Sequence, residues 1–144
     1  MSTSSGGSSA GYSGTPLVRK LGIKPHARLG LISAPEGFLS LLGELPEDVS
    51  VRSRVRGPLD VIVAFFLDRS ELVRRLPALK AALDQAGGLW IAWPKRASGV
   101  ATDMTEHVVR ELALAAGLVD NKVCAIDETW SGLRIVYRLR DRAS

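Results

Sequence analysis

The 144-residue sequence predicts an α/β protein, built on a mostly parallel, open sheet of about six strands with helices on both faces and a C-terminal antiparallel hairpin. Three observations predict this class. Residues 59–67 and 89–93 are nearly continuous apolar runs, which is typical of central parallel strands buried on both faces. Leucines at helical spacing occupy 72–83 between them, and a helical crossover of this length joins parallel strands. Residues 119–126 and 133–139 are separated only by a short polar turn, which predicts the hairpin.

The N-terminal half adds further elements to this pattern. A Thr-Pro pair at 15–16 and a glycine at position 22 are the expected start and end of a short helix. Residues 27–33 form a short apolar run that predicts a buried strand, and 38–42 predict about two turns of amphipathic helix. Valines and arginines alternate over 49–56, which predicts a half-exposed strand.

Local signals also set the expected boundaries of the later helices. Capping-box spacings at 68–71 and 103–106 predict that helices begin there. Pro77 is expected to break or kink the first of these helices. Gly87-Gly88 is expected to close that unit before the next strand, and Gly117 is expected to end the second helix.

Composition limits the class of protein. Hydrophobic residues make up 46% and charged residues 24%, so one globular domain is expected over 12–140, between a flexible tail at 1–11 and a short charged tail at 141–144. A single cysteine excludes an intramolecular disulfide, and two histidines with one cysteine exclude a zinc site of familiar spacing, so no metal is expected. Without a membrane-spanning run or a signal peptide, a cytoplasmic location is expected. The net charge of +4 permits an anionic partner without requiring nucleic acid.

Polar corners mark the expected ligand-binding edge of the sheet. Ligands of open α/β sheets bind beyond the carboxyl ends of the strands. The corners at that edge are 33–37, 68–70, 93–103 and 127–131. The last two are the richest in polar side chains, and we expect them to rim one common hollow.

The loop 93–103 supplies the cationic side of this predicted site. Lys95 and Arg96 carry the charge needed to hold a phosphate or a carboxylate. Ser98, Thr102 and Asp103 have the groups to orient an anion or a water molecule. A plain solvated loop is the alternative, in which Thr102 or Asp103 caps the following helix.

The corner 127–131 supplies the opposing wall. Asp127 and Glu128 are the candidate catalytic residues, because paired carboxylates can act as general acid and base. Thr129 and Trp130 are candidate ligand-binding residues, the indole through stacking on a planar ligand. The alternative is an ordinary polar hairpin turn.

Other residues with functional side chains have simpler expected roles. The arginines at 52, 54 and 56 either protect an edge strand from pairing with other molecules or form an anion-binding stripe. His107 is expected on the exposed side of its helix, and Trp93 and Cys124 are expected in the core.

Several segments of the chain resemble a bacterial family catalogued as a domain of unknown function, number 3052. The resemblance covers residues 11 to about 138 and implies no established activity. The segments that carry it are Gly11–Leu17, Lys20–Pro25, Trp93–Lys95, Ser98–Asp103, Lys122–Asp127 and Thr129–Leu133.

The order of elements from 72 to 139 is similar to the later half of class I methyltransferases, which implies a methyltransferase-like, Rossmann-like fold. These enzymes resemble dinucleotide binders in using a glycine-rich turn after the first strand and an acid near the end of the second. Here the corner 33–37 contains one glycine and the second strand ends in arginines. A working S-adenosylmethionine site is therefore not expected, and no cofactor is assigned.

The leading hypothesis is a cytosolic ligand-binding or regulatory domain, whose degenerate methyltransferase-like cleft holds a small anionic or nucleotide-like molecule. One alternative is a small transferase that uses Asp127 or Glu128 as a base. The other is a protein or nucleic-acid interaction module that uses the basic edge strand, for which displaced counterions would make binding salt-dependent.

Overall fold

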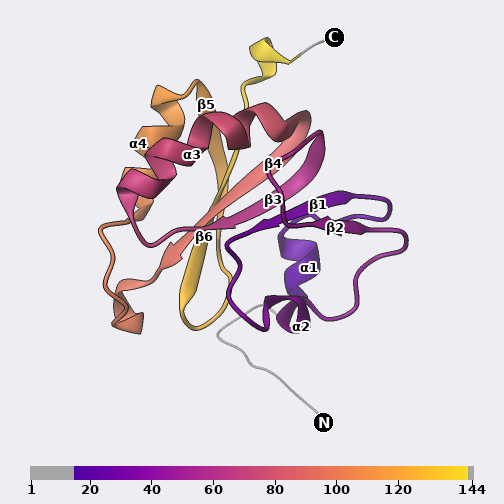
Figure 1. Cartoon of the computed structure of the whole chain (residues 1–144), viewed down its shortest axis with the longest axis horizontal. Helices are drawn as coiled ribbons and strands as arrows, with labels where there is room; N and C mark the ends of the chain where they lie inside the picture. Colours follow the sequence, from indigo (N-terminus) through magenta and orange to yellow (C-terminus); the bar gives the residue numbers. More distant parts are fainter. Residues whose placement is uncertain (1–14, 143–144) are drawn as a thin grey trace.

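A computed structural model describes residues 15–142 as a six-stranded mixed sheet with helices on both faces (Figure 1). The predicted tail at 1–11 and the last two residues of the chain lie outside this range. The helices are α1 (Leu17–Lys20), α2 (Phe38–Leu42), α3 (Arg69–Ala82) and α4 (Glu106–Ala115), with 3-10 turns η1 (Arg96–Ser98) and η2 (Leu139–Asp141). The strands are β1 (Arg28–Ile32), β2 (Ser50–Arg52), β3 (Leu59–Phe65), β4 (Leu83–Pro94), β5 (Leu118–Ala125) and β6 (Trp130–Tyr137).

The strands lie in the order β2-β1-β3-β4-β6-β5. The first four are parallel to their neighbours, whereas β6 is antiparallel to both β4 and β5. The predicted mostly parallel sheet with a C-terminal antiparallel hairpin is therefore confirmed. Because β5 runs in the same direction as β4, the corners after β1, β3, β4 and β5 all lie at one edge.

Two apolar layers explain the continuous hydrophobic runs in the sequence. Along β3, Ile62 and Ala64 pack beneath α3 and α4, whereas Val61, Val63 and Phe65 belong to the core beside α1 and α2. Figure 1 shows α3 and α4 on one side of the sheet and α1 and α2 on the other. Since both faces of the strand are covered there, every residue from Val61 to Phe65 is apolar.

The strand β2 is shorter than the alternating pattern at 49–56 predicts. It covers three residues at the edge of the sheet, and all three are exposed. Its only pairing is with β1, where Arg52 lies opposite Gly30. The predicted strand at 49–56 is therefore only partly formed. Its second half, residues 53–56, keeps the alternating pattern but pairs with no strand in the described part of the chain.

Pro77 does not end its helix, since α3 continues through it to Ala82. Pro77 and Val73 both lie on the exposed side of the helix. The carbonyl that loses its amide partner, four residues before the proline, therefore lies on the side where water can replace the missing donor. Hydrophobic contacts on the opposite side, from Leu72, Leu76 and Leu79, hold both turns against the sheet.

Gly87-Gly88 lies inside a strand and not at its start, as β4 begins at Leu83. The register against β3 slips between the pairs Leu59–Leu83 and Val61–Gly88, so the extra residues form a bulge at the beginning of β4. A Cβ at Gly87 would lie 2.6 Å from the carbonyl oxygen of Asp60. These glycines are therefore explained by close packing and not by a turn.

Candidate functional site

The two corners predicted to form a site lie side by side at the carboxyl edge of the sheet. Pro94, the last residue of β4, pairs with Trp130, the first of β6. The next amide, that of Lys95, donates a hydrogen bond of 2.7 Å to the carbonyl oxygen of Thr129. The shared edge follows from the hairpin topology, and a shared ligand site there stays a prediction.

Most polar side chains of the loop 93–103 bind other parts of the protein. The Ser98 hydroxyl donates to the carbonyl of Lys95 at 2.7 Å and accepts from the amide of Val100 at 3.1 Å. The Thr102 hydroxyl donates to the carbonyl of Leu67, at the end of the neighbouring strand. These bonds fix the course of the loop.

Asp103 caps a different helix from the one expected. Its Oδ1 accepts the amide of Arg69 at 2.7 Å and so satisfies a free donor at the start of α3. The cap of α4 is Thr105, whose hydroxyl accepts the amide of Val108 at 3.1 Å. Asp103 and Thr102 therefore tie the loop after β4 to the corner after β3.

The corner between β5 and β6 is closed by Asp127. Its Oδ1 accepts the amides of both Thr129 and Trp130 at 2.8 Å, as in a side-chain-closed turn. The side chains of Lys95, Arg96 and Glu128 make no hydrogen bond or ion pair with any residue from 15 to 142, and those of Arg96 and Glu128 are exposed. These three side chains of the two corners remain available for a ligand.

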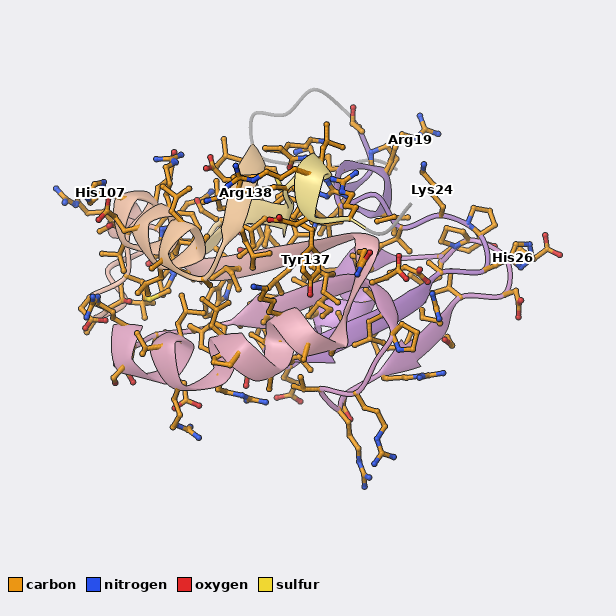
Figure 2. All side chains as sticks on the ribbon, turned by 90° about the horizontal axis from the view of Figure 1, so that it is seen from above. Arg19, Lys24, His26, His107, Tyr137 and Arg138 are labelled. Carbon is orange, nitrogen blue, oxygen red and sulfur yellow. The ribbon has the colours of Figure 1, made fainter. Side chains whose placement is uncertain are left out.

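An aromatic row runs along the same edge, from β6 to α2. The ring of Trp130 meets Phe65 edge-on at 5.1 Å, and Phe65 meets Phe38 edge-on at 5.0 Å. Trp93 is buried beneath α3 and α4, as expected for a core tryptophan. His107 and His26 point outward at opposite ends of the molecule (Figure 2).

A cavity of about 590 Å³ lies at the carboxyl ends of β1 and β2. The corner 33–37 and the start of α2 form one side of it, and residues 51–53 form the other. None of the residues predicted for the site lines this cavity. The corner 33–37 was expected at the ligand edge, but no cofactor site was expected there because the corner contains a single glycine.

The corner 33–37 borders this cavity with an unusual backbone conformation. Ser33 and Gly37 both adopt left-handed backbone conformations, with φ of 56° and 88°. A Cβ at Gly37 would meet nothing within 4 Å, so the backbone there faces open space. The corner therefore exposes backbone to the cavity as a glycine-rich turn does.

Unpaired polar groups line the same cavity. The hydroxyls of Ser33, Ser40 and Ser53 form no hydrogen bond within residues 15–142, and the Arg52 guanidinium has no partner there either. All four residues are exposed to solvent. Hydroxyl and guanidinium donors are thus available on both sides of the recess.

No model of a known protein family matches the sequence, and no curated protein matches it. The fold, in contrast, is similar to that of solved methyltransferases. A ribosomal protein L11 methylase from Lactobacillus delbrueckii subsp. bulgaricus superposes with a TM-score of 0.55 at 14% identity, over 85% of this chain and 75% of that protein. An S-adenosylmethionine-dependent methyltransferase from Aquifex aeolicus gives 0.56 at 16% identity, over 83% and 86%.

A third structure, the magnesium protoporphyrin IX methyltransferase of Synechocystis PCC 6803 with bound S-adenosylhomocysteine, gives a TM-score of 0.54 at 12% identity, over 85% and 78% of the two chains. Likeness at these identities shows the fold. The chain therefore has a methyltransferase-like, Rossmann-like fold, as the order of its later elements predicts.

The comparisons correct the leading hypothesis about function. A regulatory or ligand-binding domain with a degenerate cleft is contradicted, because the solved structures that share this fold are methyltransferases. The hypothesis itself came from the polar corners at one edge of the sheet, and only the expected degeneracy of the cleft came from the single glycine at 33–37 and the arginines at the end of the second strand. The structure shows that the corner stays open without further glycines.

Two other expectations bear on the class of protein. Among residues 15–142, no helix combines the length and apolar character needed to cross a bilayer. Within the same range, no three His, Cys, Asp or Glu side chains gather as ligands for a metal ion.

Proposed function

We propose that the protein is an S-adenosylmethionine-dependent methyltransferase whose cofactor binds in the cavity at the carboxyl ends of β1 and β2. The observation that carries the proposal is the position of this cavity in a sheet of methyltransferase-like topology. Open α/β sheets bind their ligands beyond the carboxyl ends of strands, beside the turn that follows the first strand. The corner 33–37 is that turn.

The lining residues fit such a cofactor. The volume of about 590 Å³ lies within the usual range for small-molecule sites. The hydroxyls of Ser33, Ser40 and Ser53 would bind ribose hydroxyls in place of an acid, and Arg52 would bind the carboxylate of the methionine part. The bound cofactor would supply a methyl group carried on a positively charged sulfur.

We further propose that the methyl acceptor approaches from the corners 95–98 and 127–130. Trp130 offers an aromatic surface next to the row that reaches the cavity, and Lys95 and Arg96 offer free cations. Of the two candidate carboxylates, Glu128 is the better base, since Asp127 already accepts two amides within its own turn. Thr102 and Asp103 act as positioning residues for this loop.

Two further predictions belong with this proposal. Membership of the domain family of unknown function 3052 is supported by the segments 93–95, 98–103 and 122–127. We also propose one domain at 12–140 between two tails. All six strands between residues 28 and 137 belong to one sheet, which supports a single domain.

Isothermal titration with S-adenosylhomocysteine tests the proposal, because this product has the groups that the cavity would hold. We expect saturable binding to the full-length protein, weakened by about tenfold or more in Ser40→Trp, whose indole would occupy the cavity. Ala78→Trp is the matched control, since Ala78 is also a small, exposed helical residue, and it lies in α3, on the other face of the sheet from α2. Absence of saturable binding, or equal weakening in both variants, would contradict the proposal.

A further inference from the structure

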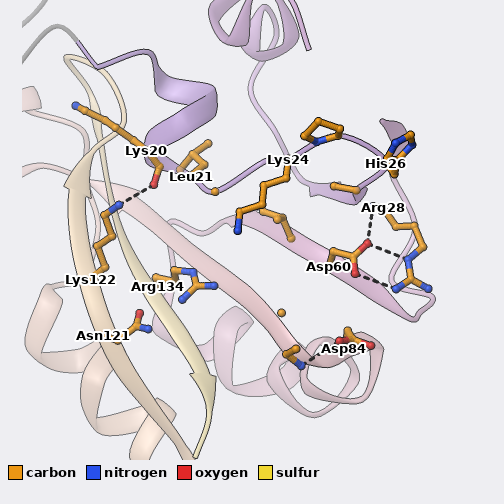
Figure 3. Close-up of a pocket in the computed structure, with 16 residues that line it drawn as sticks. Lys20, Leu21, Lys24, His26, Arg28, Asp60, Asp84, Asn121, Lys122 and Arg134 are labelled. Atoms are coloured by element: carbon orange, nitrogen blue, oxygen red, sulfur yellow. Dashed lines mark hydrogen bonds and ion pairs between the residues drawn. The ribbon is translucent and has the colours of Figure 1, made fainter. Parts of the chain in front are cut away.

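A second, larger cavity lies toward the opposite edge of the sheet. It has a volume of about 750 Å³ and is bounded by the segment 20–28, by the amino ends of β3 and β4, and by the middle of β5 and β6 (Figure 3). None of the residues at the carboxyl edge contributes to it. It is therefore separate from the proposed methyltransferase site.

Positive charge dominates the lining of this cavity. Its cationic side chains are Lys20, Lys24, Arg28, Lys122 and Arg134, and its acidic side chains are Asp60 and Asp84. Five cations face two carboxylates, so the recess has an excess of positive charge.

Both carboxylates are already engaged. Asp60 accepts three hydrogen bonds from Arg28, from the backbone amide at 2.7 Å and from Nε and Nη2 at 2.9 Å. Asp84 accepts the amide of Ala86 at 3.0 Å. Neither acid forms an ion pair with Lys24 or Arg134 in residues 15–142.

Arg134 is a partly buried cation of this cavity that has no counterion in the described residues. Its side chain is half-buried and forms no hydrogen bond or ion pair with any residue between 15 and 142. Burial, and then repulsion by Arg142, lowers the pKa of its guanidinium. An arginine nevertheless stays charged, so burial without a counterion costs free energy.

The sequence of β4 makes room for this unpaired charge. Arg134 lies opposite Trp90 in the sheet, and its guanidinium covers the backbone at Gly88. A Cβ at position 88 would overlap the guanidinium. Glycine therefore permits the position that Arg134 occupies.

Lys24 approaches from the other side of the recess. In Figure 3, the side chains of Lys24 and Arg134 both reach toward the middle of the cavity, from the segment after α1 and from β6. Lys24 also has no ion-pair partner in the described range. Lys122 lies farther along the wall, where its ammonium donates to the carbonyl of Lys20 at 3.2 Å.

We propose that this cavity binds the phosphate group of a small phosphorylated molecule. A doubly charged phosphate would neutralise Arg134 and Lys24 together, through charge-assisted hydrogen bonds to a forked guanidinium and an ammonium. A small molecule is favoured over a nucleic acid because the cations line a recess, and because the lining contains no Phe, Tyr or Trp on which bases could stack.

Titration of the full-length protein with inorganic pyrophosphate tests this proposal. We expect saturable binding that falls about tenfold or more in Arg134→Gln and in Lys24→Gln. Arg54→Gln removes the same charge from an exposed segment outside the cavity, and we expect it to bind as the wild type does. Equal affinity in Arg134→Gln and Arg54→Gln would overturn the proposal.

Thermal unfolding without ligand separates a binding role from a structural one. Because Arg134 has no partner in residues 15–142, Arg134→Gln is expected to keep or raise the wild-type melting temperature. A marked decrease would show that the guanidinium holds the fold, and would overturn the proposal.

A short DNA duplex serves as the competing ligand. Duplex binding that depends on Arg134 and is tighter than pyrophosphate binding would replace the small molecule with a nucleic acid. Titration of Arg134→Gln with S-adenosylhomocysteine is expected to match the wild type. The pyrophosphate titration therefore tests the phosphate site, and the S-adenosylhomocysteine titration tests the cofactor site, each independently of the other.

Discussion

At the scale of single residues, the ion pair between Arg28 and Asp60 is the best-connected charged contact in the described part of the chain. It joins the start of β1 to β3 by three hydrogen bonds of 2.7–2.9 Å. The bonds from Arg28 lower the pKa of the Asp60 carboxyl, against the opposing effect of burial. About a third of each side chain is exposed, so solvent weakens the pair.

Asp60→Asn is expected to lower the free energy of unfolding by about 1 kcal/mol at pH 7. Because the folded state lowers the pKa of Asp60, this contribution is present above the ordinary aspartate range near pH ~4 and is lost as the pH falls through the lower folded value. Urea unfolding of wild type and variant from pH 7 down to pH 3 would measure it.

Asp48→Asn is the control for this prediction. Asp48 contacts only the exposed His26, with side chains 75% and 65% accessible, so a change within about 0.5 kcal/mol is expected. A stability difference for Asp60→Asn that stays constant as the acid pH range is crossed would contradict the assigned charge pair.

Residue-level contacts were the least accessible to sequence reasoning. Asp103 was expected to cap the helix that follows it, but it caps α3, more distant in the chain. The glycine at position 88 is typical of a turn, but in the structure a side chain there would overlap the guanidinium of Arg134. Both contacts depend on the register of the strands and on the path of the loop, and neither can be predicted from a local sequence pattern.

At the scale of elements, Asp103 connects the loop after β4 to the first turn of α3. Asp103→Ala is expected to reduce the free energy of unfolding by about 1 kcal/mol, through loss of the hydrogen bond to the Arg69 amide. The midpoint of urea unfolding, at an unchanged slope, would measure the loss.

Asp68→Ala offers a matched comparison at the same helix terminus. Asp68 occupies the N-cap position of α3, but its side chain makes no capping hydrogen bond. We expect Asp68→Ala to lower the free energy of unfolding by less than Asp103→Ala does. Equal costs would mean that charge near the helix terminus, and not the particular hydrogen bond, stabilises α3.

Element types were predictable because periodicity and burial agree. The apolar runs at 59–67 and 89–93 became β3 and β4, and the leucine spacing became the buried side of α3. The predicted ends of these elements were wrong where tertiary contacts override the local preference of the sequence. Packing of Leu72, Leu76 and Leu79 carries α3 past Pro77, and pairing with β3 extends β4 back through its glycines.

At the scale of the whole molecule, the sheet has two polar regions with different character. The carboxyl edge carries the open corner 33–37, the aromatic row and the corners 95–98 and 127–130. The opposite side carries the cationic recess around Arg134. We propose the first region as the cofactor site and the second as a phosphate site.

Sequence reasoning predicted the ligand edge but not the cavities. The alternation of strands and helices was enough to bring 95–103 and 127–131 together, as the hydrogen bond from Lys95 to Thr129 shows. The single glycine at 33–37 argued against a cofactor site, whereas the cavity beside this corner depends on backbone conformation, which the sequence pattern does not contain. The recess around Arg134 was missed because its cations come from three separate parts of the chain.

The position at which S-adenosylhomocysteine binds is the most direct test of the proposed function. Titration of the full-length, isotope-labelled protein, followed by amide chemical shifts in NMR spectra, would map that position. We expect saturable shifts centred on residues 33–40 and 51–53, with little change near Lys24 and Arg134. Shifts centred on Lys24 and Arg134, or no saturable shifts at all, would contradict a methyltransferase cofactor site at the carboxyl ends of β1 and β2.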